Sequence, residues 1–232
     1  EGVSRAPRPL ARRSHGPAWS PLKLVIRAGS LGLKGRGAHD HDDNLSFWLF
    51  DRDDDVIIET GCSPYTRSIS EREACIRSSS HNVLTPLGQE RYALAEGSVF
   101  KTVRGAPTAL AIDHSPNSFK AIYSGSFTHE RIFLATDGVI KIHDTLKDSE
   151  NRFSLNLFLN SSECPILSRK DTLTFPAKNK RDYTVEFSGL QPNTLTHTKV
   201  QFYPNYAETQ PANHLSAELK SHTSTTTRIR RV

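Results

Sequence analysis

Two histidines one residue apart carry the clearest chemical signal in this sequence. His39 and His41 lie within the segment Gly37–Phe47, just before an apolar run. They are surrounded by three aspartates and an asparagine: Asp40, Asp42, Asp43 and Asn44. In an extended backbone alternate side chains point to one face, so both imidazoles would lie together. Neutral imidazole binds borderline metals and transfers protons near neutral pH, and carboxylates can orient the ring. The segment is a candidate for metal or proton chemistry, against the plainer interpretation of a polar loop before a strand.

The charge of the chain is unevenly distributed along its 232 residues. The formal net charge is +5, yet residues 1–36 hold eight Arg or Lys and one acid, whereas residues 39–59 hold eight acids and one base. A basic segment before an acidic patch suits a nucleic acid or an acidic polysaccharide as partner. The sequence does not support nucleic-acid binding, because it has no zinc-finger spacing, no basic helix and no aromatic-rich RNA-binding strand.

Hydropathy and cysteine content further limit the class of protein that the sequence can encode. The composition, 36% hydrophobic and 24% charged, is ordinary for a globular protein, and no run predicts a membrane span or a secretory signal. The chain begins at Glu1 and contains no Met, which indicates a fragment or a processed chain whose signal would lie upstream. Cys62, Cys75 and Cys164 form no Cys-x-x-Cys motif. Three separate thiols are favoured, and a bridge between Cys62 and Cys75 stays open.

Short strand-like runs dominate after residue 21. Residues 1–21 contain four prolines and scattered arginines, and we expect an irregular basic arm there. The later runs are rich in β-branched residues and separated by turn residues, which predicts an all-β fold, a large antiparallel β-sandwich over residues 22–232. The runs are Leu22–Arg27, Leu45–Phe50, Val56–Thr60, Val99–Val103, Thr108–Ile112, Phe119–Tyr123, Arg131–Ala135, Val139–His143, Phe153–Leu159, Thr172–Phe175, Tyr183–Phe187, Lys199–Tyr203 and Thr223–Ile229.

The remaining local signals are weaker. The acidic segment Asp51–Asp55 predicts a hairpin with a solvated tip, and it lacks the spaced Gly and Glu of a calcium loop. The run Ser70–Ile76 predicts one short helix capped by Ser70, and residues 214–220 are ambiguous. The Gly32-x-x-Gly35-x-Gly37 cluster does not have the spacing of a dinucleotide fingerprint. It predicts a loop that brings backbone close to the histidine pair.

Several motifs follow one another in a recognisable order. They are Arg27–Gly29, Gly37–Phe47, Ile57–Gly61, Tyr65–Thr66, Arg77–Ser78, Ser80–Val83, Glu130–Ile132, Ile140–Thr145, Tyr203–Tyr206 and a final basic strand. In this order the chain resembles the C-terminal domain of heparinase II/III-like polysaccharide lyases. The resemblance covers roughly residues 22–231, and the His-x-His-x-Asp…His-Asn combination is fairly specific to that family.

The resemblance implies a supersandwich-like β-sandwich packed beside an α-helical toroid, with the active site between them. Enzymes of that family cleave acidic polysaccharides by β-elimination. Their toroid supplies a catalytic Tyr and an Asn or His, and the sandwich supplies a His. Residues 1–21 are too few to form a toroid, so we expect the C-terminal part of a lyase, with little activity on its own. A periplasmic or secreted location is implied, and a homodimer stays open.

The resemblance also assigns roles to individual residues. His39 corresponds to the catalytic histidine of the family. His41, Glu59 and His81 correspond to the ligands of a structural zinc ion, and calcium is a less favoured cofactor. Glu59 stands where the family usually has Asp, so the metal could sit differently or be lost. Further substrate contacts, or contacts that support the site, are expected from Asp43, Asn44, Tyr65, Arg77 and Asn82, although a turn, ladder or surface role is equally open for each.

Two other functions fit the same residues. The first is a non-catalytic carbohydrate-binding or scaffold sandwich with a structural metal, which an upstream sequence lacking a toroid would favour. The second is a cupin-like metal oxygenase, which also uses His-x-His, Glu and a distant His. A cupin places the Glu only a few residues after the pair, whereas Glu59 lies far downstream. The sequence does not identify the polysaccharide.

Overall fold

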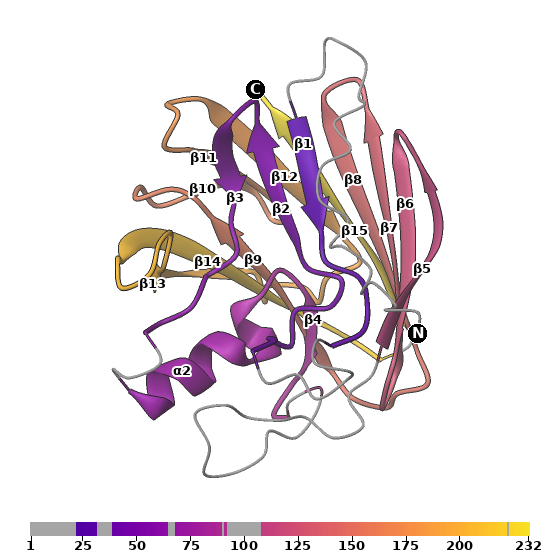
Figure 1. The fold of residues 1–232 in the computed structure, drawn as a ribbon. Helices are drawn as coiled ribbons and strands as arrows, with labels where there is room; N and C mark the ends of the chain where they lie inside the picture. The colour runs from indigo at the N-terminus through magenta and orange to yellow at the C-terminus, as the bar shows by residue number, and fades with distance from the viewer. Residues whose placement is uncertain (1–21, 32–38, 65–67, 90, 92–107, 222) are drawn as a thin grey trace, which may run out of the picture.

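Two facing antiparallel sheets form the body of the molecule, and the loop after the first strand lies at one end of them (Figure 1). The structure is a computed structural model. It describes residues 22–31, 39–64, 68–89, 91, 108–221 and 223–232. The basic arm, the glycine cluster, Tyr65 and the predicted strand Val99–Val103 lie outside the described residues. Within the described ranges, no helix is long and apolar enough to cross a membrane.

The first sheet contains seven strands: β1 (Leu22–Ile26), β2 (Phe47–Asp51), β3 (Asp54–Ile57), β4 (Leu84–Pro86), β9 (Phe153–Leu159), β13 (Thr196–Phe202) and β14 (Gln210–Leu219). Their order is β1-β2-β3-β9-β14-β13, and β4 pairs with β9 beside this path. Most of these strands come from the two ends of the chain, so the sheet joins segments far apart in sequence.

The second sheet contains eight strands: β5 (Thr108–Ser115), β6 (Ser118–Ser124), β7 (Thr128–Thr136), β8 (Val139–Lys147), β10 (Ile166–Arg169), β11 (Thr172–Pro176), β12 (Asp182–Ser188) and β15 (Ser224–Arg231). Their order is β10-β11-β12-β15-β8-β7-β6-β5. The last strand of the chain, β15, lies between β12 and β8 and completes the sheet.

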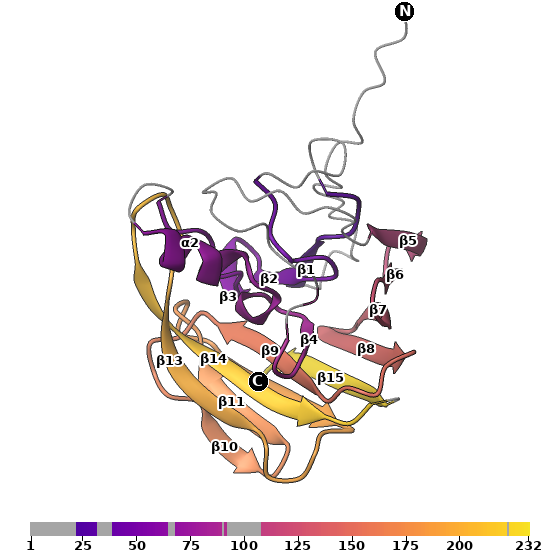
Figure 2. The same ribbon diagram turned by 90° about the horizontal axis from the view of Figure 1, so that it is seen from below.

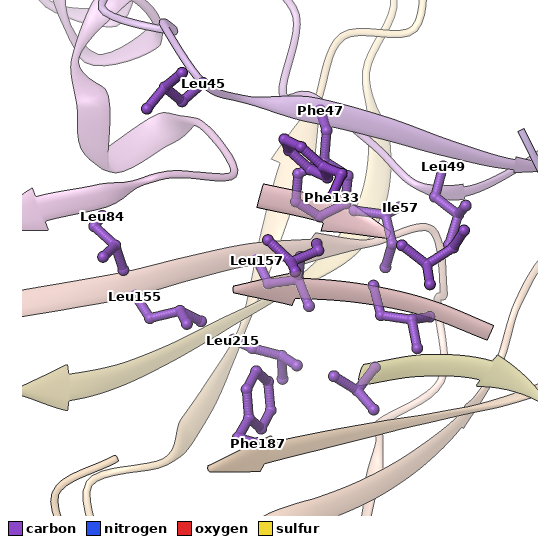
Figure 3. Packing of buried hydrophobic residues seen from close by; sticks show 14 of the residues in the cluster. Leu45, Phe47, Leu49, Ile57, Leu84, Phe133, Leu155, Leu157, Phe187 and Leu215 are labelled. Atoms are coloured by element: carbon purple, nitrogen blue, oxygen red, sulfur yellow. The ribbon is translucent and has the colours of Figure 1, made fainter. Parts of the chain in front are cut away.

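One hydrophobic core fills the space between the two sheets. Alternate residues of β2 face inward, so Phe47 and Leu49 are buried while Trp48 is partly exposed. Phe47 meets Phe133 of the second sheet with ring centroids 5.5 Å apart and the rings edge-on. Figure 3 shows further partners from both sheets: Leu155, Leu157, Phe187 and Leu215. Each fully buried side chain of this kind contributes about 1.5 to 3 kcal/mol to stability.

A short helix, α2 (Ile69–Ile76), lies outside the two sheets next to the loop that leads into β2 (Figures 1 and 2). The side chain of Ser68 caps it by accepting from the N–H of Glu71 at 3.3 Å. Its buried residues are Arg72, Cys75 and Ile76, which the 3.6-residue repeat places on one side. A 3-10 turn, η1 (Ser78–Ser80), follows and leads towards β4.

The structure confirms the predicted antiparallel sandwich and corrects some of its elements. The predicted run Phe153–Leu159 is β9, and the acidic hairpin joins β2 to β3. The prediction for the helix cap was wrong, because Ser68 and not Ser70 caps α2. Residues 214–220 were ambiguous, and residues up to Leu219 belong to β14, since pairing with β9 and β13 outweighs their helical propensity. The sequence did not predict β4 or β10.

Candidate functional site

The histidine pair lies in a loop between β1 and β2 whose backbone is held at several points. The N–H of Arg27 donates to the carbonyl of Ser46 at 3.0 Å, and the N–H of Leu45 donates to the carbonyl of Arg27 at 2.7 Å. The N–H of Asp42 donates at 2.8 Å to the carbonyl of Ile76, the last residue of α2. The loop is therefore tied to the end of β1 and to α2, which gives its side chains a fixed backbone.

Two buried arginines support the same loop from inside the molecule. Nη1 of Arg131 donates to the carbonyl of Leu45 at 2.8 Å, and Nη1 of Arg91 donates to the carbonyl of Asn44 at 3.0 Å. Leu45 has a φ of 72°, a left-handed conformation that costs energy in a residue other than glycine. Full burial of its side chain and the bond from Arg131 hold Leu45 in that conformation.

Arg131 also connects the two sheets. It comes from β7, and its Nε and Nη2 bind the two carboxylate oxygens of Asp144 on β8 at 2.6 and 3.2 Å. Its Nη1 donates to the carbonyl of Asn82, ahead of β4, at 2.6 Å. Burial raises the pKa of Asp144, but the Arg131 charge and hydrogen bonds from His129 and Arg131 outweigh it and hold that pKa well below its usual range. The result is a buried ion pair within the second sheet, and the bonds from Arg131 Nη1 connect it to the segments next to β2 and β4 of the first sheet.

His129 makes this network sensitive to acid. Its Nε2 donates to Asp144 Oδ1 at 2.7 Å, and burial lowers the pKa of His129 to about 4, despite the opposing effect of Asp144. An unfolded histidine titrates near pH 6.5. As the pH falls from about 6.5 to about 4, the unfolded chain takes up a proton that the folded chain does not, so stability falls over this window.

We expect acid to lower the free energy of unfolding by up to about 3 kcal/mol through His129 alone. His214, whose pKa burial also lowers to about 4, adds to the loss. Urea unfolding between pH 7 and pH 4 measures this, and His129→Gln should flatten the dependence by one proton. The exposed His197 on β13 offers a control, since His197→Gln should leave the slope unchanged. Parallel slopes for wild type and His129→Gln would contradict the assignment.

Glu59 and His81 form a buried pair behind the loop. Nδ1 of His81 and Oε2 of Glu59 are hydrogen-bonded, and Oε1 of Glu59 accepts from the backbone N–H and the Nδ2 of Asn82 at 3.0 and 2.8 Å. Burial lowers the pKa of His81, but the charge and hydrogen bond of Glu59 outweigh burial and raise it overall. Both oxygens of Glu59 are therefore engaged by protein donors.

The side chain of Asn82 hydrogen-bonds to the backbone of β2, of β9 and of Ile58, the residue that follows β3. Its Nδ2 bonds to the carbonyls of Phe47 and Ile58 at 2.9 and 2.7 Å, and its Oδ1 accepts from the N–H of Phe158 at 2.8 Å. The side chain is fully buried, so Asn82 lies where it can support the site and not where a polysaccharide could reach it. The same holds for Asn44, which is 3% exposed.

His41 lies against His81, with ring centroids 5.2 Å apart, and faces α2. Nη1 of Arg72 lies 2.8 Å from His41 Nε2 and donates to Cys62 Sγ at 2.9 Å. A guanidinium only donates, so His41 Nε2 accepts and the ring carries its proton on Nδ1. Burial, together with the charges of His81 and Arg72, lowers the pKa of His41 well below its usual value. His41 is therefore a neutral imidazole.

The three predicted zinc ligands gather in one place, but their donor atoms do not converge. Glu59 is directed at His81 and Asn82, and His41 Nε2 is directed at Arg72. In the part of the chain that the structure describes, no three His, Cys, Asp or Glu side chains form a group that could hold a metal ion. The present arrangement does not fit a three-ligand zinc site. Zinc binding by these residues stays a prediction, as does calcium.

His39 is exposed and lies in a turn, two residues before His41. Asp43 is half-buried and pairs with Arg27 at 3.6 Å. Arg77 is half-buried and lines a groove of about 500 Å³ over β4 and β9 with Ser79, Thr85 and neighbouring residues. The catalytic, metal and substrate roles predicted for these residues stay predictions. The exposed His39 differs in its surroundings from the half-buried His41 and the buried His81.

The sequence did not predict the arginines that organise this site. Arg72, Arg91 and Arg131 are each about 3% exposed or less. One signal was available for Arg131, because it shares the inward face of β7 with His129 and Phe133, at alternate positions. A charged residue in such a register indicates a buried ion pair. No comparable pattern marks Arg72, because its burial depends on how α2 packs.

Comparisons with known proteins identify a family and several solved structures that share this architecture. Residues 15–230 match the family model for the heparinase II/III-like C-terminal domain. The fold matches a heparinase III described as the BT4657 gene product (TM-score 0.70, 17% identity), heparan sulfate lyase HepC from Pedobacter heparinus (0.70, 13%) and a further heparinase III (0.72, 12%). Comparison with curated protein sequences gave no match.

These alignments cover 90–91% of this chain but only 32–33% of each solved structure. The chain therefore spans about a third of the length of the lyases that it matches. At such identities the structural likeness concerns the fold, and the family model adds the sequence pattern over most of the chain. All-β architecture, motif order and sequence match agree, and the chain belongs to the heparinase II/III-like C-terminal domain family.

Proposed function

We propose that this chain is the β-sandwich part of a lyase that cleaves an acidic, uronic-acid-containing polysaccharide by β-elimination. The observation that carries the proposal is the placement of His39. It is exposed in the loop between β1 and β2, and hydrogen bonds tie parts of this loop to the end of β1, to α2 and to the buried Arg131. Family membership and the names of the matched structures, which include a heparan sulfate lyase, supply the reaction class.

His39 suits one step of such a reaction. β-Elimination removes a weakly acidic proton next to the uronate carboxylate and expels the glycosidic oxygen at the neighbouring carbon. An imidazole near neutral pH can transfer that proton, or its charged form can offset the carboxylate. The bond from the N–H of Asp42 to the Ile76 carbonyl fixes the backbone three residues after His39, which would limit the reorganisation of His39 during the reaction.

The remaining groups of the active site would come from elsewhere in the complete protein. We propose an upstream α-helical toroid that supplies a Tyr and an Asn or His, in keeping with the third of the matched lyases that this chain spans. On this chain, Arg77 and the groove over β4 and β9 would contact acidic groups of the substrate, and Tyr65 and Asp43 are further candidate contacts. A periplasmic or secreted location would give access to such a polymer.

Ultraviolet absorbance of the unsaturated uronate product tests the proposal directly. The complete protein should produce this chromophore from at least one polymer in a panel containing heparan sulfate, alginate and bacterial acidic exopolysaccharides. Binding of these polymers without any chromophore would instead support the alternative, a non-catalytic carbohydrate-binding or scaffold sandwich.

A further inference from the structure

The guanidinium of Arg72 stands between two side chains that commonly bind metals. Its Nη1 lies 2.8 Å from His41 Nε2 and 2.9 Å from Cys62 Sγ. Imidazole nitrogen and cysteine sulfur are typical zinc ligands, at about 2.0–2.1 and 2.3 Å respectively. One charged nitrogen, Nη1 of Arg72, therefore lies at the point on which these two donors converge.

We propose that Arg72 takes the place beside His41 that a zinc ion would need, so that the cluster of His41, Glu59 and His81 is held together without metal. The proposal concerns the cluster behind the loop and is independent of the lyase activity. It also opposes the zinc site that the family resemblance implies, and the same measurement decides between them.

The geometry of Glu59 supports the replacement. Its two oxygens accept from His81 Nδ1 and from both nitrogens of Asn82, so protein donors engage the whole carboxylate. The Glu59 side chain acts as a hydrogen-bond acceptor that joins His81 to Asn82, a role that a structural metal would otherwise serve by holding these segments together.

The packing of α2 explains why the guanidinium stays in place. Arg72 is 3% exposed and shares the buried side of the helix with Cys75 and Ile76. Cys75 Sγ accepts from the N–H of Ser63, and the Ile76 carbonyl accepts from the N–H of Asp42. These bonds hold the C-terminal end of the helix, within four residues of Arg72, against the loop and Ser63. A divalent cation at His41 would have to displace a fixed positive charge, and the repulsion disfavours it.

Metal analysis and thermal unfolding of the 232-residue chain, freed of any His tag, test the proposal. We expect no stoichiometric zinc in the wild type and no change in Tm with chelator or added zinc sulfate. Arg72→Ala removes the cation and exposes His41 Nε2 and Cys62 Sγ to the vacated space. It should bind zinc at least about tenfold more tightly than the wild type, because the repulsion is gone. Added zinc should then raise its Tm, and His41→Ala in the same chain should abolish the rise.

Arg228→Ala is the matched control, because Arg228 is an exposed arginine on β15 that pairs with Glu186. It should behave like the wild type towards zinc. One tightly bound zinc per wild-type chain, lost in His41→Ala, would overturn the proposal and restore the predicted zinc site. A folded Arg72→Ala chain that gains no affinity for zinc would overturn it as well. Should Arg72→Ala not fold, Arg72→Met keeps more of the packing and enters the same comparison.

Discussion

If the complete protein is the proposed lyase, replacing His39 with alanine should lower the rate of elimination about 10²- to 10⁴-fold while the fold stays intact. That range is the usual contribution of a positioned group that transfers a proton. The fold should survive because His39 is exposed and lies outside the hydrophobic core. The measurements are the initial rate of chromophore formation and the Tm of the variant.

A histidine far from the loop provides the control for His39→Ala. His197 is exposed on β13 and pairs with Leu215 of β14, so His197→Ala should retain the wild-type rate. A His39→Ala enzyme with full activity would remove His39 from the mechanism. An enzyme that loses activity together with its Tm would show that His39 acts on the fold and not on the reaction.

Replacing Arg131 with methionine should destabilise the sandwich by about 3 to 5 kcal/mol, the usual result of removing one partner from a buried ion pair. The change leaves the Asp144 carboxylate buried without its arginine, and it leaves the carbonyls of Leu45 and Asn82 without a donor. A domain of this kind is stable by only about 5 to 15 kcal/mol, so the loss would be a large fraction of the total. Urea unfolding at pH 7 measures it.

The destabilisation caused by Arg131→Met should depend on the burial of its ion pair and not on the loss of charge alone. Lys120 on β6 pairs with Glu130 of β7 at 2.9 Å with both side chains partly exposed, so Lys120→Met should cost about 1 kcal/mol or less. Adding Asp144→Leu to Arg131→Met should recover part of the loss, because the unpaired buried carboxylate is removed. Equal destabilisation by Arg131→Met and Lys120→Met would contradict the role of Arg131 as the buried link between the sheets.

Local sequence patterns predicted most of the strands because each alternates apolar and polar residues and ends at turn residues. Phe153–Leu159 is an example, since its pattern and its boundaries coincide with β9. The strand β14 was missed because Gln210–Leu219 contains good helix formers, and only pairing with β9 and β13 makes it a strand. The short β4 and β10 lack enough residues to show a period.

The candidate site was predictable where residue type alone carried the signal. The histidine pair and its aspartates marked the loop, and family spacing identified Glu59 and His81 as its neighbours in space. The contacts that decide the chemistry were not predictable, because they depend on distant elements. Arg72 reaches His41 only when α2 packs on the loop, and Arg131 reaches Leu45 only when the second sheet faces the first.

The most direct test of the proposed two-part lyase compares the 232-residue chain with the complete protein on the same acidic polysaccharide. The chain alone should fold as a β-sandwich and give little or no unsaturated uronate, because proton transfer and fixed electrostatic groups from the missing part each contribute orders of magnitude. The complete protein should give the product readily. Robust elimination by residues 1–232 alone, proportional to protein and absent in His39→Ala, would contradict the account and place a complete active site within the sandwich.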